Sequence, residues 1–476
     1  MRGISSRRLA DLLGDLAGDR FPRYAALAGR IRLLTADGRL PVGVRLPAER
    51  DLAAAAGLSR STVTAAYARL REDGWATARW GAGTWTALPV GPDRGAWVPA
   101  PAEQGVVDLA HAGPSAPPEV PAAFAAALDD LPRLLPGHGY HPGGLPELRA
   151  RVAERYTGRG LPTTPEQVLV TGGALHGLTV AFEAVVRRGK RLLVEHPTYP
   201  NALDAAWAMG RRVLPVAVDV ERPDEWLDGM EGALSQARPA AAYVMPDFQN
   251  PTGLLLDDPR RERLARALAR ANAHAIVDET FVELGLDATA GAPLAAFAPG
   301  HLSVGSLSKA FWGGLRIGWV RAEADLVKRL TAIAARSQLS GPALEQLAAC
   351  HLLDGAEAAL EAQRGRLRER RRVLVAALRR RLPAWVVPEP AGGLVLWCRL
   401  PSARSTVLAA VAERHGLRLA AGPRFGTGHA FDDRLRLPFT QPPEQLEHAV
   451  DLLAAADADA AGAAQPAVGG QRTPIV

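Results

Sequence analysis

Lysine, cysteine and long apolar runs are scarce or absent in this sequence. Of the 56 basic residues only three are lysines, Lys190, Lys309 and Lys328. The two cysteines, Cys350 and Cys398, lie far apart without the spacing of metal ligands, which indicates packed free thiols in a reducing cytoplasm. No run of about 18 apolar residues occurs, so we expect no membrane span. The first residues are basic and polar rather than apolar, so we expect no secretory signal.

The basic residues are unevenly distributed along the chain. With 476 residues the chain exceeds one ordinary domain, and its 48% hydrophobic residues suffice for two or three packed cores. Residues 1–85 contain 14 arginines and 8 acidic residues, whereas the remaining 391 residues contain 42 of each sign. The whole net charge of +6 therefore lies in the first sixth of the chain. This segregation predicts a polyanionic partner for the N-terminal part.

The first 86 residues have the pattern of helices followed by a hairpin. Apolar residues recur at helical spacing from residue 24 onward. A second helix would begin near Pro47 and end at Gly57, and Ser59 would cap a third helix that runs to about residue 73. Two short helices joined by a glycine-containing turn are typical of the helix-turn-helix motif. The alternation over residues 75–86, interrupted by glycines, predicts a two-stranded wing.

The predicted third helix carries polar groups that suit DNA. Arg60, Ser61, Thr62 and Thr64 lie at its N-terminal end, where they can reach base edges or phosphates in the major groove. The apolar residues of the same helix would face inward; these are Val63, Ala66 and Leu70. The alternative reading is that its arginine is an ordinary surface charge.

Residues 24–86 resemble the winged helix of the GntR family of transcription regulators. The resemblance is carried by the segments 46–50 and 59–63, by Tyr67, and by Gly74, Gly81 and Gly83. It implies that Arg50, Arg60, Ser61 and Thr62 contact double-stranded DNA. It also implies that Gly81, at the tip of the wing, approaches the minor groove.

The rest of the chain divides into a linker, a large domain and a tail. Residues 87–106 contain several prolines and glycines, as expected of a semi-stiff linker. From residue 107 to 456, short apolar runs alternate with amphipathic segments, which predicts an α/β domain with a mainly parallel sheet. The expected strands are 168–170, 191–195, 241–245, 275–277 and 302–304. Residues 457–476 are rich in alanine, glycine and proline, and we expect them to be disordered.

Five predicted strand ends carry polar, aromatic or glycine residues, and ligands of such sheets bind at these ends. Lys309 follows the last of them; because arginine cannot form a Schiff base, a lysine kept in an arginine-rich chain is a candidate for covalent chemistry. On its local sequence alone, Lys309 could equally be a solvated surface lysine. Asp278 ends another strand, and Tyr199 follows a third. Pyridoxal phosphate requires a lysine for its aldehyde, a carboxylate for its pyridine nitrogen, a ring to stack on and donors for its phosphate.

The order and spacing of these residues resemble the fold-type I, class I/II aminotransferases, which add a smaller C-terminal α+β subdomain. The resemblance implies a Schiff base between pyridoxal phosphate and Lys309, a contact of Asp278 with the pyridine nitrogen, and stacking by Tyr199. It implies that Asn250 bonds the phenolic oxygen and that Arg436 grips a substrate carboxylate bidentately. The implied phosphate-binding residues are Gly172, Gly173, Ala174, Ser306, Ser308 and Arg316, with Tyr140 reaching the phosphate bound by a partner subunit.

The sequence departs from the aminotransferase pattern at three places. Thr280 and Phe281 stand where the family usually has a tyrosine that donates to the phenolic oxygen, so this bond would depend on Asn250 alone. Gly172 replaces a common hydroxyl residue, which leaves a backbone contact with phosphate. His176 replaces a frequent glutamine, and we interpret it as a packing residue.

A GntR-type winged helix joined to an aminotransferase-like domain resembles the MocR subfamily of regulators. The resemblance implies a cytoplasmic, homodimeric transcription regulator that binds pyridoxal phosphate, operator DNA and an amine or amino acid effector. Two alternatives stay open. The first is an active aminotransferase with a DNA-binding appendage, and the second is a sensor of pyridoxal phosphate that controls synthesis of this vitamin.

Overall fold

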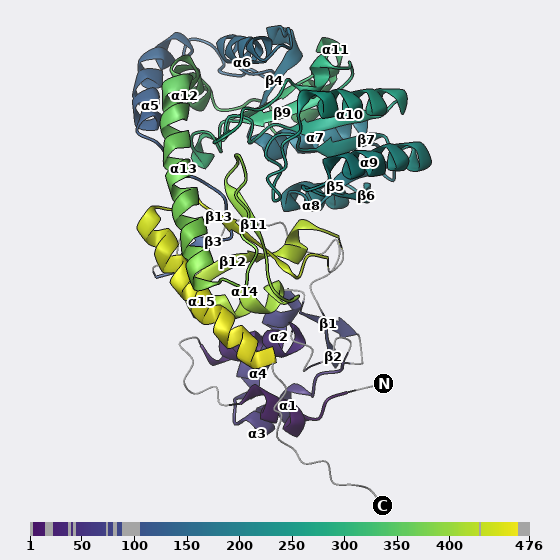
Figure 1. Cartoon of the computed structure of the whole chain (residues 1–476), viewed down its shortest axis with the longest axis vertical. Coiled ribbons are helices and arrows are strands. Elements are labelled where there is room, and N and C mark those ends of the chain that lie inside the picture. The colour runs from purple at the N-terminus through teal and green to yellow at the C-terminus, as the bar shows by residue number, and fades with distance from the viewer. Residues whose placement is uncertain are drawn as a thin grey trace, which may run out of the picture.

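The computed structural model describes residues 3–14, 22–36, 40, 44–72, 75–79, 83–87, 105–427 and 430–464. Along the long axis of the molecule lie a large α/β domain, a smaller sheet with its helices, and the N-terminal helical unit (Figure 1). No helix in this part of the chain is both long and apolar enough to cross a membrane. The linker segment 88–104 and the predicted DNA contact Gly81 fall outside the described residues.

The N-terminal unit forms the predicted helix-turn-helix and wing. Its elements are α1 (Ser6–Leu13), α2 (Arg23–Ala36), α3 (Glu49–Ala56), α4 (Arg60–Glu72), β1 (Ala76–Arg79) and β2 (Gly83–Thr86). Gly57 ends α3 with a φ of 65°, a left-handed conformation that glycine adopts readily. The Ser59 hydroxyl accepts a bond of 3.1 Å from the Thr62 amide and so caps α4. Strands β1 and β2 pair antiparallel, which confirms the wing.

The large domain is built on a seven-stranded sheet with the strand order β4-β10-β9-β8-β7-β5-β6. Its strands are β4 (Val168–Thr171), β5 (Arg191–His196), β6 (Arg212–Ala217), β7 (Ala241–Val244), β8 (His274–Asp278), β9 (Leu302–Ser306) and β10 (Gly318–Arg321). Neighbouring strands are parallel except at β10, which is antiparallel to both β4 and β9. The expected mainly parallel sheet is thus confirmed, and β6 and β10 are additions that the sequence did not predict.

Alternating side chains of the strands supply a core on each face of this sheet. In β7, for example, Tyr243 packs with α7 and α8 on one face, whereas Val244 packs with α9 and α10 on the other. Both faces are apolar because helices cover both, as is usual for parallel sheets. The helices are α5 (Glu119–Asp130), α6 (Pro146–Gly158), α7 (Ala174–Val185), α8 (Pro200–Ala208), α9 (Pro223–Ala237), α10 (Asp258–Arg270), α11 (Ala324–Ala334) and α12 (Ala343–Asp354).

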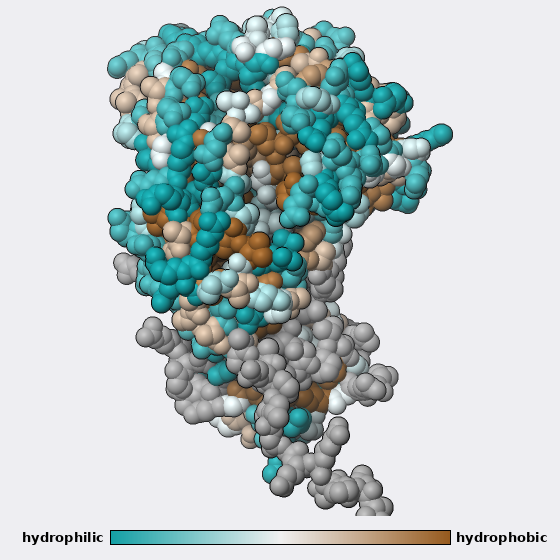
Figure 2. Space-filling view, viewed as in Figure 1, coloured by the Kyte–Doolittle hydropathy of each residue, from teal (hydrophilic) through white to brown (hydrophobic). Residues whose placement is uncertain are grey.

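The long helix α13 (Ala356–Arg381) leads into a small subdomain, which we define as β11–β13, α14 and α15 together with the earlier strand β3 (Figure 1). Its sheet has the order β11-β13-β12-β3, and only the β12–β3 pair is parallel. The bounds are β3 (Val107–Leu109), β11 (Val395–Arg399), β12 (Leu417–Ala421), β13 (Arg434–Pro438), α14 (Ser405–Arg414) and α15 (Pro443–Ala464). Figure 2 shows apolar side chains gathered where this subdomain meets the large domain.

Helix α15 corrects one expectation about the C-terminal tail. The tail was expected to be disordered from residue 457, but the helix continues to Ala464. Leu453, Ala456 and Ala460 are buried on one face of this helix and join the core of the small subdomain. Alanine is also the strongest helix former, so small residues here extend a helix rather than end it. Residues 465–476 lie outside the part of the chain that the structure describes.

The N-terminal unit packs on the small subdomain. Helix α2 lies against α14 (Figure 1). Across this contact the Arg32 guanidinium forms an ion pair of 2.6 Å with Glu413. Farther along the chain, the end of the linker enters the small subdomain as strand β3, where the Val107 amide donates to the Gly416 carbonyl. The winged helix is therefore attached to the small subdomain by a packed contact as well as by the chain itself.

Candidate functional site

Lys309 lies just beyond the carboxyl end of β9, at the edge of the sheet where ligands of such folds bind. Its amine donates a hydrogen bond of 2.7 Å to the Ala112 carbonyl. Burial lowers the pKa of Lys309 to about 8; the charges of Arg436 and Arg316 act in the same direction, and Asp278 opposes them. Because charges influence a pKa strongly only at short range, these four side chains share one site. A lysine with this pKa is partly neutral near pH 7 and can act as a nucleophile.

Asp278 is the last residue of β8 and is only 3% exposed. The Tyr243 hydroxyl donates to its Oδ2 at 2.7 Å, and the Thr280 amide donates to Oδ1 at 3.0 Å. The Thr280 hydroxyl donates to the same Oδ1. Burial raises the pKa of Asp278, and these donors together with the Lys309 charge oppose that rise. The result is a fixed, buried carboxylate of the kind that can hold a cationic ring nitrogen.

Tyr243 is a site residue that the sequence analysis missed. It comes from β7, and its side chain is fully buried between the helix layer and Asp278. The available signal was a single hydroxylated ring within an otherwise apolar strand, because a buried tyrosine needs a partner for its hydroxyl. Phe281, in contrast, is 2% exposed and belongs to the apolar core with Phe248 and Leu284. It therefore offers the site no hydroxyl, as its sequence position predicts.

Arg436 brings the small subdomain into the site from β13. It is 5% exposed, and its Nη1 lies 3.4 Å from the Asn250 Oδ1 of the large domain. Its Nη2 donates to the Ala110 carbonyl, and its guanidinium lies 4.8 Å from the centre of the Phe425 ring. Burial lowers the pKa of Arg436 to about 10, which leaves it charged at neutral pH. A buried, oriented guanidinium of this kind suits a carboxylate ligand.

Tyr199 stands directly before α8 and is half-buried. Burial raises the pKa of its hydroxyl to about 12; the Asp278 charge adds to this rise and the Arg436 charge opposes it. These interactions place the ring near the carboxylate and the guanidinium of the site. The structure thus brings Lys309, Asp278, Tyr199 and Arg436 together from four different strands or strand ends.

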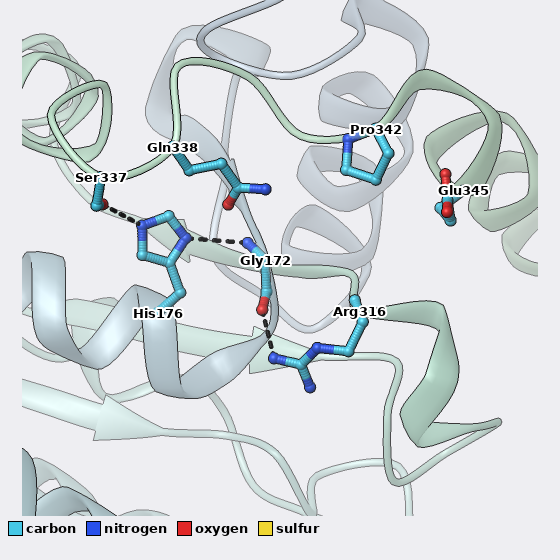
Figure 3. Close-up of a pocket in the computed structure, with 7 residues that line it drawn as sticks. All are labelled: Gly172, His176, Arg316, Ser337, Gln338, Pro342 and Glu345. Atoms are coloured by element: carbon cyan, nitrogen blue, oxygen red, sulfur yellow. Dashed lines mark hydrogen bonds between the residues drawn. The ribbon is translucent and has the colours of Figure 1, made fainter.

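The turn before α7 forms a concave cradle beside Arg316. Gly173 has a φ of 96°, a left-handed conformation that favours glycine, and a Cβ at this position would lie 2.8 Å from the Arg316 Nη2 and displace the end of that side chain. The Arg316 Nη2 donates to the Gly172 carbonyl at 2.6 Å. Ala174 begins α7, and backbone amides at a helix N-terminus attract anions. A cavity of about 560 Å³ opens here (Figure 3); it is lined by Gly172, His176, Arg316, Ser337, Gln338, Pro342 and Glu345.

His176 does more than fill space in this cradle. Its Nδ1 accepts a bond of 3.1 Å from the Gly172 amide, and its Nε2 lies 3.2 Å from the Ser337 hydroxyl (Figure 3). Burial lowers the pKa of His176; Gln338 opposes this effect and the Arg316 charge adds to it. The interpretation of His176 as a structural residue stays a prediction, to which the structure adds these two hydrogen bonds. The ring ties the cradle to the segment that follows α11 through both of its nitrogens.

The remaining predicted phosphate-binding residues lie in two places. The Ser306 hydroxyl donates to the Ile317 carbonyl at 3.0 Å and lies 3.0 Å from the Ser308 hydroxyl, next to Lys309. Tyr140 is 56% exposed, and its ring stacks on His138 with 5.6 Å between ring centres. Its predicted contact with a partner subunit stays a prediction.

The second predicted site is the exposed N-terminal end of α4. Arg60 and Ser61 are exposed, and the Arg50 side chain on α3 is 87% exposed. The Ser59 hydroxyl lies 2.9 Å from that of Ser61 and 2.7 Å from that of Thr62, so three hydroxyls cluster around the helix cap. Basic and hydroxyl groups at a free helix end are suited to phosphate and base contacts.

Thr64 is exposed, and its hydroxyl has partners within the protein. It donates to Glu49 at 2.7 Å and lies 3.0 Å from the Arg60 carbonyl. These bonds join α4 to the start of α3. The predicted DNA contact of Thr64 stays a prediction, but the hydroxyl already has partners in this structure.

Comparison with known proteins identifies both parts of the chain. The family model for aminotransferase class I and II matches residues 116–453, and that for bacterial regulatory proteins of the gntR family matches residues 23–85. The chain belongs to the aminotransferase class I and II family. Its fusion with a GntR-type winged helix is the layout of the MocR-type regulators, and the cofactor of the aminotransferase family is pyridoxal phosphate.

The relatives include both regulators and enzymes. The HTH-type transcriptional regulator YdcR of Escherichia coli is 31% identical over 444 residues, which cover 85% of this chain and 92% of that protein. The regulatory protein MocR of Rhizobium meliloti is 27% identical over 460 residues, 89% of each chain. The 2-aminoadipate transaminase of Thermus thermophilus is 31% identical over 313 residues, covering 64% of this chain and 76% of the enzyme.

The solved structure of LysN, an α-aminoadipate aminotransferase from Thermus thermophilus in complex with N-(5'-phosphopyridoxyl)-L-leucine, has the same fold. It superposes with a TM-score of 0.69 and 28% identity over 75% of this chain and 94% of that one. The residues of the present site fit the family cofactor. They supply an amine of lowered pKa, a buried carboxylate oriented by three donors, an aromatic ring, and a glycine cradle beside an arginine.

Proposed function

We propose that this protein is a pyridoxal phosphate-dependent transcription regulator that senses an amine or amino acid effector. The observation that carries the proposal is the convergence of Lys309, Asp278 and Arg436 in a chain that also presents an exposed, capped helix α4. A half-buried lysine close to a buried carboxylate and a buried arginine is costly unless ligands compensate the charges. A transcription regulator is the function that would use both the DNA-binding groups and the cofactor-binding groups of this chain.

Each residue of the cofactor site has a definite task in this proposal. Pyridoxal phosphate, when bound, supplies the aldehyde carbon with which amines condense. The neutral amine of Lys309 holds the cofactor through that carbon, and Asp278 keeps a proton on the pyridine nitrogen. Arg436, oriented by Asn250, holds the carboxylate of an amino acid effector. The cradle at residues 172–174 and Arg316 hold the phosphate.

Regulation follows from competition and linkage. With the cofactor bound, Lys309 and an amine effector would be alternative amines for its aldehyde, and Arg436 on the small subdomain would hold the effector carboxylate. A ligand that binds one arrangement of the two domains more tightly shifts the population toward that arrangement. Since the winged helix packs on the small subdomain, such a shift changes how α4 is presented to DNA. In a homodimer two winged helices bind paired half-sites.

An active transaminase is the second candidate. Transaminases stand among the relatives, and lysine, aspartate and arginine are all in place. Phe281 lies in the apolar core and leaves the site without the usual donor to the phenolic oxygen, which favours slow turnover. Production of keto acid over many turnovers would support this candidate. DNA affinity that changes on addition of pyridoxal phosphate alone would instead support a sensor of the cofactor itself.

The test combines cofactor trapping with DNA binding. Purified protein is incubated with pyridoxal phosphate, reduced with borohydride and digested, and the modified peptide is identified by mass spectrometry. We expect modification at Lys309, none in Lys309→Ala, and unchanged labelling in Lys328→Ala, whose side chain is 79% exposed and pairs with Asp325. Duplexes selected from a random pool then report DNA affinity by fluorescence anisotropy, with and without a panel of amino acids. Labelling that persists in Lys309→Ala would refute the cofactor assignment.

A further inference from the structure

The segment that joins the linker to the large domain contacts two cations of the site, Lys309 and Arg436. Strand β3 pairs with β12 and ends at Leu109, and Ala110, His111 and Ala112 follow it directly. Ala110 and Ala112 are 3% and 7% exposed. We call residues 108–112 the strap.

Two carbonyl groups of the strap bind the cations that the proposed function assigns to ligands. The Ala112 carbonyl accepts from the Lys309 amine at 2.7 Å, and the Ala110 carbonyl accepts from the Arg436 Nη2. Carbonyl oxygens are natural partners for both groups, because ammonium and guanidinium are donors only. In this arrangement the strap occupies donors that a cofactor aldehyde and an effector carboxylate would use.

The shape of the strap depends on one side chain, Asp108. Its Oδ1 accepts from the Ala110 amide at 2.7 Å and from the His111 amide at 3.1 Å. Its Oδ2 lies 2.8 Å from the His111 Nδ1 and 3.6 Å from the Arg418 Nη1 on β12. The Asp108 carbonyl accepts from the Gln441 side chain at 3.4 Å. These bonds turn the chain sharply and aim the carbonyls of residues 110 and 112 at Arg436 and Lys309.

We propose that the strap is an internal ligand of Lys309 and Arg436, that Asp108 is its positioning residue, and that a bound ligand releases it. This inference rests on the proposed function, since it takes pyridoxal phosphate and an amino acid to be the competing ligands. It goes beyond the proposed function because it names the segment whose contacts change when a ligand occupies the site. The strap begins within β3, which pairs with β12 of the small subdomain on which α2 packs, so its release would act on the subdomain that contacts the winged helix.

The strap and the bound ligands compete for the same hydrogen-bond donors of Lys309 and Arg436. A condensed Lys309 no longer has the free amine that donates to Ala112, and an effector carboxylate draws on the donors of Arg436. Each strap bond that a ligand must displace lowers ligand affinity by roughly two- to tenfold, the equivalent of one net hydrogen bond. By reciprocity, weakening the strap raises ligand affinity by the same factor. A purely structural role for Asp108 predicts the opposite sign, because a loosened site binds ligands less well.

The experiment measures this sign in Asp108→Ala, with Asp108→Asn as a milder variant that keeps one acceptor oxygen. Asp219→Ala is the matched control: Asp219 accepts from the amides two and three residues later, at 2.9 and 3.1 Å, in an exposed turn outside the site. The probes are pyridoxal phosphate, which engages Lys309, and N-(5'-phosphopyridoxyl)-L-leucine, which adds a carboxylate for Arg436. Affinities come from isothermal titration of the full-length protein, and hydrogen–deuterium exchange follows the peptide that spans residues 105–113.

We expect Asp108→Ala to bind both probes roughly two- to tenfold more tightly than the wild type, and Asp219→Ala to match the wild type. In the wild type, exchange in residues 105–113 should accelerate when N-(5'-phosphopyridoxyl)-L-leucine binds. Weaker probe binding by both Asp108 variants, or a strap that becomes more protected in the complex, would overturn the inference. Borohydride trapping at Lys309 in the wild type separates the proposed function from the proposal about the strap. If trapping succeeds while the Asp108 and exchange experiments contradict the expectation, the proposed function stands and only the role of the strap is refuted.

Discussion

The lowered pKa of Lys309 leads to a quantitative prediction about how fast the protein captures its cofactor. Only the neutral amine attacks an aldehyde, so the capture rate follows the neutral fraction of Lys309. Burial, Arg436 and Arg316 bring this pKa from an ordinary 10.5 to about 8. At pH 7 about one amine in ten is then neutral, roughly 300 times the fraction for an ordinary lysine.

The assay mixes cofactor-free protein with pyridoxal phosphate between pH 6.5 and 10 and quenches with borohydride at short times. Labelling of Lys309 should rise about tenfold per pH unit up to about pH 8 and then level off. The sign can be tested with Arg436→Gln. The Arg436 charge lowers the pKa of Lys309, so its removal should raise that pKa and move the profile to higher pH. A rate that climbs without a break to pH 10 in the wild type would refute the reasoning.

Three further predictions concern stability and are checked by denaturant unfolding. Tyr243→Phe removes the hydroxyl that donates to the buried Asp278 carboxylate and should cost about 1.5–3 kcal/mol. Arg261→Leu leaves Asp247 buried without its 2.5 Å ion-pair partner, so we expect a loss of about 3–5 kcal/mol. Ser59→Ala removes the cap of α4 and should cost about 1 kcal/mol.

Each of these changes has a control. Tyr24→Phe removes a hydroxyl from a ring that is 42% exposed and should leave stability unchanged. The double variant Arg261→Leu, Asp247→Leu removes both charges and should recover part of the loss, although the carbonyls that Arg261 bonds stay without their donor. A double variant as unstable as the single one would contradict the argument. Ser59→Asn keeps a capping oxygen and should unfold like the wild type.

Much of the large domain could be predicted from local pattern. Strands such as β7 and β8 are short apolar runs bounded by polar residues, and their burial on both faces produces that pattern directly. Strand β6 was not predicted, because Pro215 lies within it and its residues are only partly buried at the sheet edge. Strand β10 has only four residues and follows a glycine-rich run, which conceals its antiparallel pairing.

Some contacts of the candidate site could be predicted from the sequence, and others could not. Lys309 and Asp278 could be predicted because their side chains carry distinctive chemistry at strand ends. The contacts of Lys309 with Ala112 and of Arg436 with Ala110 could not, since every residue has a backbone carbonyl and the partners lie 197 and 326 residues apart. The bond from Tyr243 to Asp278 depends on the pairing of β7 with β8, and strand pairing is a property of the fold rather than of either segment.

The packing of α2 on α14 places the N-terminal unit in direct contact with the small subdomain. In the part of the chain that the structure describes, the N-terminal unit contacts this subdomain through α2 and α14, with the Arg32–Glu413 ion pair across the contact. Under the regulatory proposal, a tilt of the small subdomain at Arg436 would therefore carry α4 with it, and disrupting the Arg32–Glu413 contact would uncouple the two.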